Sequence, residues 1–359
     1  MAPSIGPVKA RKLIDKLGSA QEVFKGQEKE LQSIEGIGPT TSRSLDNRSL
    51  ISRARQELEY TARHRIRIIS FDDPAFPDQL NQCEDGPILI YARGEQGLQC
   101  KRSLSVVGTR RATTYGRDVC RQVVKDLSQK IKDLVIVSGL AYGIDVIAHQ
   151  AALDAGIPTV AVLGHGFSTI YPYAHREVAR KIIRSGALVT DFHSGMGPER
   201  NNFLRRNRII AGMSNATLVV ESASEGGALI TADLAASYGR DVLAVPGRTT
   251  DMRSKGCNEL IKSCKAALVQ SAEDVLYHLN WDPDRPDTAP SPRPVASPEN
   301  EELQLLQLMI SKPGMKPDTL SAHSGIPIQK VLSILLQMEL KRWIMVEPGS
   351  RYHCLITPS

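Results

Sequence analysis

The sequence predicts an α/β protein with a doubly wound, Rossmann-like parallel sheet, preceded by a helix-hairpin-helix (SAM-like) domain and followed by a winged-helix domain. Three observations predict this fold class. Strand and helix patterns alternate over residues 101–275, short helices with Gly-Pro turns come before them, and a proline-rich stretch leads to a small tail. We therefore divide the chain into residues 1–65, 66–277, 278–299 and 300–359.

The composition is that of a folded protein without a membrane anchor. The 359 residues suit two or three domains. No apolar run approaches the roughly 20 residues of a membrane span, and no signal peptide opens the chain. The six cysteines are scattered without a CxxC pair. This spacing favours reduced thiols in a cytoplasmic protein without a structural metal.

The positive charge of the chain is concentrated in its middle. Residues 101–275 carry 23 Lys and Arg against 16 Asp and Glu, whereas the two signs balance over residues 1–100. A localised positive field suggests a polyanionic partner, although a basic enzyme surface has the same composition.

Two Gly-Pro turns punctuate the helices expected in residues 1–65. The segments "SIGPVKARKLIDKLG" and "IEGIGPTTSRSL" each place Gly-Pro before a helix, as a helix-hairpin-helix does. Backbone amides at such a turn can face a phosphate, but any tight helix–helix turn also needs glycine. Both interpretations stay open. Residues 66–100 then form an irregular bridge to the next domain, with two short strands, "RIIS" and "ILIYARG".

Strand and helix patterns alternate regularly after residue 101. Apolar, β-branched runs bounded by glycine are typical of strands buried on both faces of a parallel sheet. The predicted strands are "LSVVG", "DLVIVSG", "PTVAVLG", "ALVTDF", "ATLVVES" and "DVLAVPG", with helices such as "YGRDVCRQVVKDLSQKI", "DVIAHQAALDAG", "YAHREVARKIIRSG" and "ALITADLAASYGR" between them, and "GCNELIKSCKAALVQ" closing the region as a helix and a short strand.

A proline-rich linker is predicted over residues 278–299, before a small tail domain. Three helical patterns, "EELQLLQLMIS", "KPDTLSAHSG" and "IPIQKVLSILLQMELKRW", precede a predicted hairpin around Pro348-Gly349. This arrangement resembles a winged helix, whose third helix reads a DNA groove. Because the leucines and isoleucines of that helix follow core spacing, a protein-docking module is the preferred interpretation.

The first candidate phosphate site is "SVVGTRRATTYG", directly after the first strand of the α/β region. Phosphates dock there in doubly wound folds, between a strand's carboxyl end and a helix N-terminus. We expect Gly108 to let the backbone approach a phosphate, Thr109 to donate through its hydroxyl and amide, and Arg110 to donate two hydrogen bonds. The pattern G-x-G-x-x-G is absent, so no dinucleotide cofactor is predicted.

Two further loops repeat this geometry. In "VSGLAYGIDVIAH", Gly139 and Gly143 frame a turn, where Gly139 is expected to contact a phosphate, and Asp145 and His149 share a helix face. These two can form an acid/base pair, but we favour a structural hydrogen bond. In "LGHGFSTIYPYAH", tyrosines 171 and 173 either stack on nucleobases or pack within their own loop.

Arginines cluster in "ERNNFLRRNRIIAGMS", interpreted as a loop-to-helix entry at the same sheet edge. Arg200, Arg206 and Arg208 are expected to line one groove with Arg110, because the planar arginine fork matches phosphate oxygens. Asn207 is expected to cap the helix or touch a base. Alternatively, arginines of the "RNR" run pair internally with Glu221 or Asp191.

A last glycine turn, in "ESASEGGALITAD", offers further amides to an anion. Gly226 and Gly227 stand at a predicted helix start, and Thr231 follows inside that helix.

These motifs together resemble the bacterial DNA-processing protein A family, also called DprA or Smf. The resemblance runs through "VVGTRRATTYG", "SGLAYGIDVIAHQAAL", "VAVLGHGFSTIYP", "NFLRRNRIIAGMSNATLVVES", "GGALITADLA", "GRDVLAVPG" and "GCNELI". It implies a non-catalytic protein that binds single-stranded DNA, loads the RecA recombinase onto it and helps displace single-strand-binding protein during natural transformation. It also implies a homodimer formed through the α/β domain.

By motif match, the resemblance places Arg110 on the family's phosphate-binding arginine and Arg200 on a DNA-contacting basic residue. Asn207 and Arg208 keep the family's "RNRIIAG". The chain departs from the family at Gly226-Gly227-Ala228, where members often have "SGS" or "SGA", and after "YP", where members commonly have asparagine.

An enzyme is the alternative reading. The α/β region also resembles, distantly, nucleoside-monophosphate phosphoribohydrolases with the motif P-G-G-x-G-T-x-x-E. In "EGGALITAD", Asp233 falls at the carboxylate position, but Leu229 and Ile230 replace Gly and Thr. A shorter acid behind apolar residues suits general acid catalysis poorly.

Overall fold

The computed structural model describes residues 5–45, 48–281, 300–311, 315–341, 343–347 and 351–354. The chain divides into two compact units, Met1–Asp284 and Arg285–Ser359. This division falls inside the predicted linker, most of which (282–299) lies outside the described residues, as does the predicted Pro348-Gly349 turn. The finer domain boundaries stay predictions.

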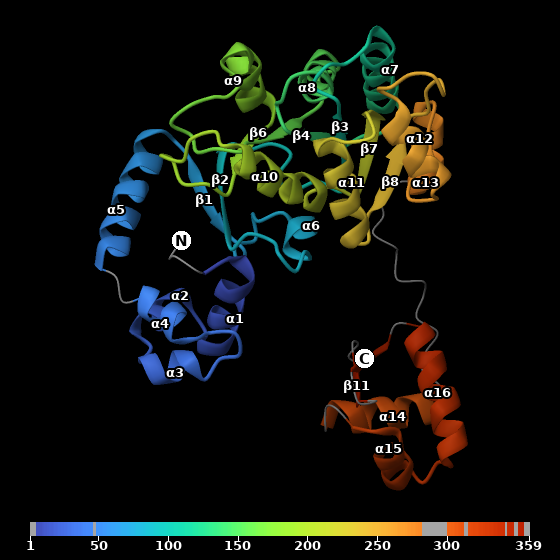
Figure 1. The fold of residues 1–359 in the computed structure, drawn as a ribbon. Helices are drawn as coiled ribbons and strands as arrows, with labels where there is room; N and C mark the ends of the chain where they lie inside the picture. The colour runs from blue at the N-terminus through green and yellow to red at the C-terminus, as the bar shows by residue number, and fades with distance from the viewer. Residues whose placement is uncertain are drawn as a thin grey trace. The chain divides into compact units, whose positions relative to one another are not determined.

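The first unit begins with five helices, of which the first four enclose a small apolar core (Figure 1). Pro7 occupies the first turn of the first helix, where its missing N–H costs no bond. Gly18 ends that helix in the left-handed conformation, at a φ of 88°, and the Ser19 side chain caps the next helix. The helices are α1 (Pro7–Leu17), α2 (Ala20–Lys25), α3 (Glu28–Gln32), α4 (Pro39–Leu45) and α5 (Arg48–Arg63).

A mostly parallel sheet follows, which confirms the predicted fold class. The described residues form a nine-stranded sheet in the order β1-β2-β6-β5-β4-β3-β7-β8-β9, in which β1, β2 and β6 pair antiparallel and the remaining pairs are parallel. The strands are β1 (Arg67–Ser70), β2 (Leu89–Gly94), β3 (Arg102–Gly108), β4 (Leu134–Ser138), β5 (Thr159–Val162), β6 (Ala187–Thr190), β7 (Ala216–Glu221), β8 (Asp241–Ala244) and β9 (Ala267–Leu268).

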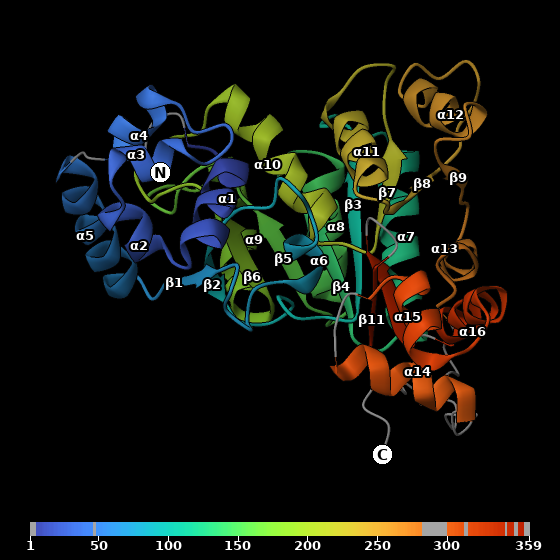
Figure 2. The ribbon, with the colours of Figure 1, turned by 90° about the horizontal axis from the view of Figure 1, so that it is seen from below.

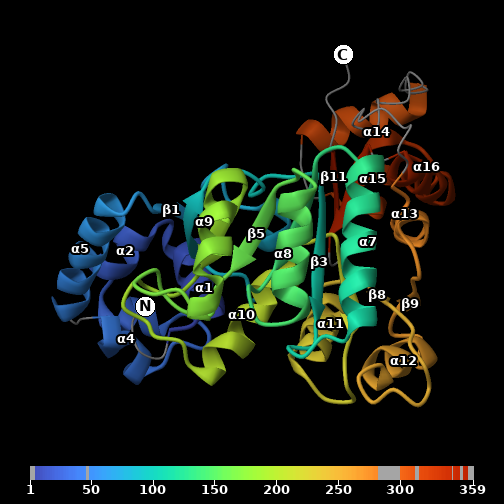
Figure 3. The same cartoon turned by 90° about the horizontal axis from the view of Figure 1, so that it is seen from above.

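Helices cover both faces of this sheet. Figure 3 shows α7, α8 and α9 in front of one face, and Figure 2 shows α10 and α11 in front of the other. Each layer buries its own apolar cluster against the strands. The helices are α6 (Asp78–Asn81), α7 (Thr114–Lys130), α8 (Ile144–Asp154), the 3-10 turn η1 (Tyr173–His175), α9 (Arg176–Ser185), α10 (Arg200–Gly212), α11 (Gly227–Ser237), α12 (Lys255–Lys262) and α13 (Ala272–Leu279).

The connectivity reverses between β3 and β7. From β3 the chain passes through β4 and β5 to β6 on one side, whereas β7, β8 and β9 extend the sheet on the other side. Ligands of doubly wound sheets bind at such a switch point, outside the carboxyl ends of the strands. The loops after β3, β7 and β8 therefore meet at one edge.

The arginine-rich segment differs from the prediction. It is the 13-residue helix α10 rather than a loop that enters a helix, so Asn207 lies in its middle and caps nothing. The arginine and asparagine content masked the helical period, and the N-cap residue, Glu199, makes no side-chain capping bond.

The second unit, by itself, is a three-helix fold with a two-stranded sheet, as predicted. Its core includes Leu305, Leu306, Val331, Leu335 and Trp343. The elements are α14 (Asn300–Ser311), α15 (Pro317–Ser324), α16 (Ile328–Leu340), β10 (Ile344–Glu347) and β11 (Arg351–Cys354), the two strands pairing antiparallel.

Candidate nucleic-acid interface

A cavity of about 610 Å³ lies at the switch point between β3 and β7. The loop after β3, the exposed side of α10 and the turn that opens α11 form its walls. Most of the predicted site residues line it: Gly108, Thr109, Arg110, Arg200, Arg206, Asn207, Gly226, Gly227 and Thr231. Gly139 and Arg208 do not.

The turn before α11 leaves its first amides open to this cavity. Gly226 is the N-cap and no side chain caps the helix. A Cβ on Gly226 or Gly227 would find no atom closer than 3.6 Å, so space lies beside the backbone. Asn207 donates from Nδ2 to the Gly227 carbonyl at 3.2 Å, and the Thr231 hydroxyl donates to the same oxygen at 3.0 Å. A helix N-terminus held open in this way favours an anion.

The loop after β3 is fixed by Glu221 at the end of β7. The Glu221 carboxylate accepts from the Thr113 amide at 2.9 Å and from the Thr113 hydroxyl at 2.7 Å. Thr109 donates its amide to the Glu221 carbonyl at 2.7 Å. The expectation that the Thr109 amide contacts phosphate is therefore wrong, because this donor is already satisfied.

Gly108 also has a packing role that the sequence did not reveal. A Cβ at this position would lie 2.5 Å from Cγ1 of Ile144, the first residue of α8. The close approach that requires glycine is thus made by a helix of the same chain, which seats α8 against β3.

Arg110 and Arg200 are the exposed cations of the cavity lining. Arg110 lies over the Phe203 ring, at 5.8 Å from its centroid, and Phe203 contacts Tyr171 at a centroid distance of 5.6 Å. Tyr171 lines the cavity, whereas Tyr173, 70% exposed, does not. The cavity therefore combines arginine forks with two aromatic rings, the groups that hold phosphates and bases.

Arg206 lines the cavity from inside the protein. It is only 3% exposed, and its Nη1 donates to the Val162 carbonyl at 2.9 Å. Burial lowers the pKa of Arg206 to about 10, although the nearby Asp145 carboxylate opposes this shift. A Cβ on Gly139 would lie 1.6 Å from this Nη1. Gly139 therefore makes room for the Arg206 guanidinium, and its assignment to phosphate binding is corrected.

Arg208 points away from the cavity, so the expectation that it lines the groove is wrong. Its Nη2 lies 2.5 Å from Oδ2 of Asp191, in an ion pair whose side chains are 10% and 3% exposed. Nη1 donates to the Asp85 carbonyl. Of the two internal partners predicted for the "RNR" arginines, Asp191 is the one that pairs with Arg208. The Glu221 carboxylate instead accepts hydrogen bonds from Thr113.

Asp145 and His149 share a face of α8 as predicted but bind different partners: the Asp145 carboxylate accepts from the backbone of Ala141 and Gly139, and His149 pairs with Thr159. Nδ1 of His149 lies 2.7 Å from the Thr159 hydroxyl, which donates its own hydrogen to the Ile136 carbonyl. The ring must therefore donate from Nδ1. Burial lowers the pKa of His149 to about 3 and raises that of Asp145 above the usual range. Both groups are buried, and their separate bonds are structural.

Helical phase would have revealed one residue that the sequence interpretation missed. Within α10, Arg200, Phe203 and Asn207 are spaced three and four apart and share the face that lines the cavity. Arg208, one position further, lies outside that face. Recognising the helix would have added Phe203 and removed Arg208.

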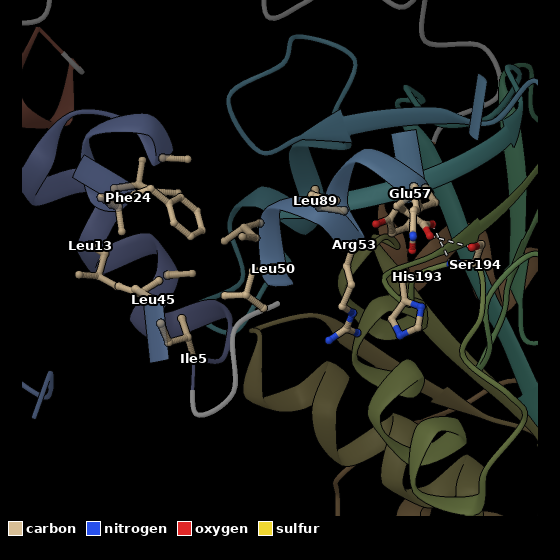
Figure 4. Close-up of a pocket in the computed structure, with 18 of the residues that line it drawn as sticks. Ile5, Leu13, Phe24, Leu45, Leu50, Arg53, Glu57, Leu89, His193 and Ser194 are labelled. Carbon is tan, nitrogen blue, oxygen red and sulfur yellow. Dashed lines mark hydrogen bonds between the residues drawn. The ribbon is translucent and has the colours of Figure 1, made fainter. Parts of the chain in front are cut away.

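A second cavity, of about 670 Å³, lies between α1, α2, α5 and β2 (Figure 4). Apolar side chains such as Leu13, Phe24 and Leu45 line one part of it. At the other end Glu57 accepts from the amide and hydroxyl of Ser194, both at 2.7 Å. Because its lining is mostly apolar, this cavity suits a polyanion poorly.

The described residues contain neither a cluster suited to a metal site nor a membrane-spanning helix. Within residues 5–45, 48–281 and the described parts of the tail, no group of three or more His, Cys, Asp or Glu could hold a metal ion. Over those same residues, no helix is both long and apolar enough to cross a membrane.

Comparison with known proteins identifies the family. The profile of the DNA recombination-mediator protein A family matches residues 67–280, and that of the DprA winged helix domain matches residues 289–350. The chain belongs to the DNA recombination-mediator protein A family. The predicted membership is thereby confirmed.

Curated relatives and solved structures agree with this membership. Protein Smf of Escherichia coli is 37% identical over 79% of this chain and 76% of its own length. The putative DNA processing protein DprA of Mycobacterium tuberculosis is 32% identical over 96% and 89%. The X-ray structure of DNA processing protein A from Streptococcus pneumoniae covers 76% of this chain and 93% of its own, with a TM-score of 0.66 and 30% identity.

A further solved structure concerns DNA binding directly. DNA processing protein A from Helicobacter pylori, described for its single-stranded DNA binding mode, is 26% identical with a TM-score of 0.52. The match covers 57% of this chain and 93% of that one.

Proposed function

We propose that this protein binds single-stranded DNA by its phosphate backbone in the switch-point cavity. One observation carries the proposal: two exposed arginines, Arg110 and Arg200, converge with the uncapped N-terminus of α11 on one cavity. Each group suits an anion, and together they suit successive phosphates of one strand. The single-stranded DNA binding of the Helicobacter pylori relative supports the choice of ligand.

The cavity favours an unpaired strand over a duplex. Its rings, Phe203 and Tyr171, can stack only on bases that are free to leave a helix. Aromatic residues make up 5% of the chain, so we expect stacking to add little sequence preference. Affinity should instead depend steeply on salt, because bound phosphates release counterions.

We further propose a non-catalytic role in natural transformation and recombination. In this role the protein protects incoming single strands in the cytoplasm and loads the RecA recombinase onto them. It helps to displace single-strand-binding protein, and it acts as a homodimer through its α/β domain. RecA filament formation on strands coated with single-strand-binding protein tests the loading step; no acceleration by this protein would reject it.

The alternative phosphoribohydrolase activity has a weaker basis. Its required carboxylate corresponds to Asp233, whose side chain is 61% exposed and lies 3.3 Å from Lys265. Asp233 is not part of the cavity lining. Release of free base from nucleoside monophosphates would revive this activity.

The direct test is fluorescence anisotropy with single-stranded and duplex oligonucleotides across a salt series. We expect single strands to win a competition against duplex. The double variant Arg110→Ala/Arg200→Ala should weaken binding of all sequences alike and lower the slope of log affinity against log salt by about 1.4. The matched control is Lys101→Ala/Lys132→Ala, which removes two exposed cations at the opposite sheet edge, before β3 and β4. Unchanged retention of the strand by the arginine variant would reject the site.

A further inference from the structure

The segment 247–255, here called the loop, lies between β8 and α12, ends at the first residue of α12 and lies beside the switch-point cavity. It follows the carboxyl end of β8, the parallel neighbour of β7, and so leaves the same sheet edge. Figures 2 and 3 both show α12 next to α11 at this edge. The Gly256 amide, directly after the loop, donates to the Ser222 carbonyl at 2.9 Å. Ser222 and Ala223 line the cavity, so the loop continues its wall.

The loop is rigid where it meets the sheet. Asn258 holds Gly247 from both sides, accepting from its amide at 3.1 Å and donating to its carbonyl at 3.0 Å. Ser254 is 5% exposed and occupies the space that a Cβ on Gly247 would need. Backbone bonds from Asp251 to Arg248 and from Ser254 to Asp251, both 3.0 Å, fold the segment between them. A loop that is already ordered loses little conformational entropy when it binds a ligand.

The loop presents three cations to solvent. Arg248, Arg253 and Lys255 are exposed, and over the described residues none of them is within ion-pair distance of a carboxylate. The acids nearby along the chain are Asp251 in the loop and Glu259 in the next turn of α12, so positive charge dominates.

An exposed methionine and an exposed tyrosine ring lie near these cations. Met252 is 63% exposed within the loop. Tyr115, in the first turn of α7, is 47% exposed and donates its hydroxyl to the Pro246 carbonyl at 2.7 Å. Tyr115 thereby joins the base of the loop to the segment that carries Arg110. An unpaired base can pack on a phenol ring or a thioether, while its phosphates meet arginine.

We propose that this loop is a second contact surface for single-stranded DNA, which extends the strand's path from the cavity over Tyr115 to Arg248, Arg253 and Lys255. The inference rests on the proposed function of the cavity and adds a separate, length-dependent component. A strand long enough to leave the cavity meets the loop, whereas a very short one does not.

The test compares full-length wild-type protein with the triple variant Arg248→Ala/Arg253→Ala/Lys255→Ala. The probes are fluorescent oligothymidylates of about 30 and about 4 nucleotides. On the long strand, the slope of log affinity against log salt should fall by about 2, since each lost phosphate contact removes about 0.7. On the short strand, the variant should bind as the wild type does.

A matched control separates the loop from a general charge effect. Lys101→Ala/Lys132→Ala/Arg184→Ala removes three exposed cations that precede β3, β4 and β6, at the opposite edge of the sheet. It should leave the salt slope on the long strand unchanged. An equal fall in slope for both triple variants would overturn the loop surface, and so would no fall for the loop variant. In either case the cavity proposal stands if the wild type binds and Arg110→Ala/Arg200→Ala weakens that binding. If the wild-type protein binds neither probe, both proposals are overturned.

Discussion

Two sets of arginines, the cavity pair and the buried pair, lie in contrasting surroundings. The cavity pair, Arg110 and Arg200, is exposed at the mouth of the cavity. The buried pair, Arg206 and Arg208, is 3% and 9% exposed and donates to partners inside the protein. Arginine is thus a solvent-exposed cation in one set and a buried hydrogen-bond donor in the other.

The difference teaches that helical phase, rather than arginine content, decides which cation can meet a ligand. Arg200 and Arg208 belong to the same helix, two turns apart, yet Arg208 faces Asp191 and Asp85 while Arg200 faces the cavity. A charged group taken out of water must be paired or neutralised within the protein. We therefore expect the buried pair to determine stability and the cavity pair to determine binding.

The largest expected effect comes from breaking the buried ion pair. Arg208→Ala leaves the Asp191 carboxylate, 3% exposed, without its cation. Removing one partner of a buried pair typically costs about 3–5 kcal/mol of unfolding free energy. Urea unfolding followed by circular dichroism measures this loss.

A double variant sharpens this prediction. Arg208→Met/Asp191→Leu removes both charges and fills similar volume, so it should recover much of the stability lost by Arg208→Ala. If Arg208→Ala unfolds at the wild-type urea midpoint, the ion pair does not support the fold and the contrast between the two sets fails.

An intermediate effect should appear with pH at His149, which is buried near Arg206. The pKa of His149 is about 3 in the folded protein because burial disfavours its charged form, against 6.5 for a free histidine. Only the unfolded chain therefore takes up this proton between pH 6.5 and 3, so stability is complete above 6.5 and falls below it. At pH 5.5 the loss should be about 1.4 kcal/mol.

Urea midpoints at pH 7.5 and 5.5 measure this loss, with His149→Asn as the comparison. Asparagine can still donate to the Thr159 hydroxyl but does not titrate. The variant should be less stable at pH 7.5 yet lose less on acidification. An identical pH dependence in both proteins would rule out His149 as its source and leave His165 and His193, whose pKa values burial also lowers.

The sequence predicted the sheet well and the direction of side chains poorly. The run "DLVIVSG" located β4 to within one residue at each end, because an apolar, β-branched run that ends at a glycine is a local signal. In contrast, residue 139 must be glycine because the Arg206 guanidinium, 67 positions further along the chain, occupies the space that a Cβ would need. Likewise, Arg208 finds its partner Asp191 on a segment that precedes α10. Such pairings depend on packing between elements, which no local pattern records.

The smallest expected effect is on stability when the cavity pair is removed. Arg110→Ala and Arg200→Ala each delete an exposed guanidinium, and over the described residues neither side chain lies within ion-pair distance of a carboxylate. Exposed substitutions of this kind usually change the unfolding free energy by less than about 0.5 kcal/mol. Urea midpoints within error of the wild type, in variants that lose affinity for single strands, would place these arginines in binding alone. A loss as large as that of Arg208→Ala would show that the cavity pair also holds the fold together, and the distinction between the two sets of arginines would disappear.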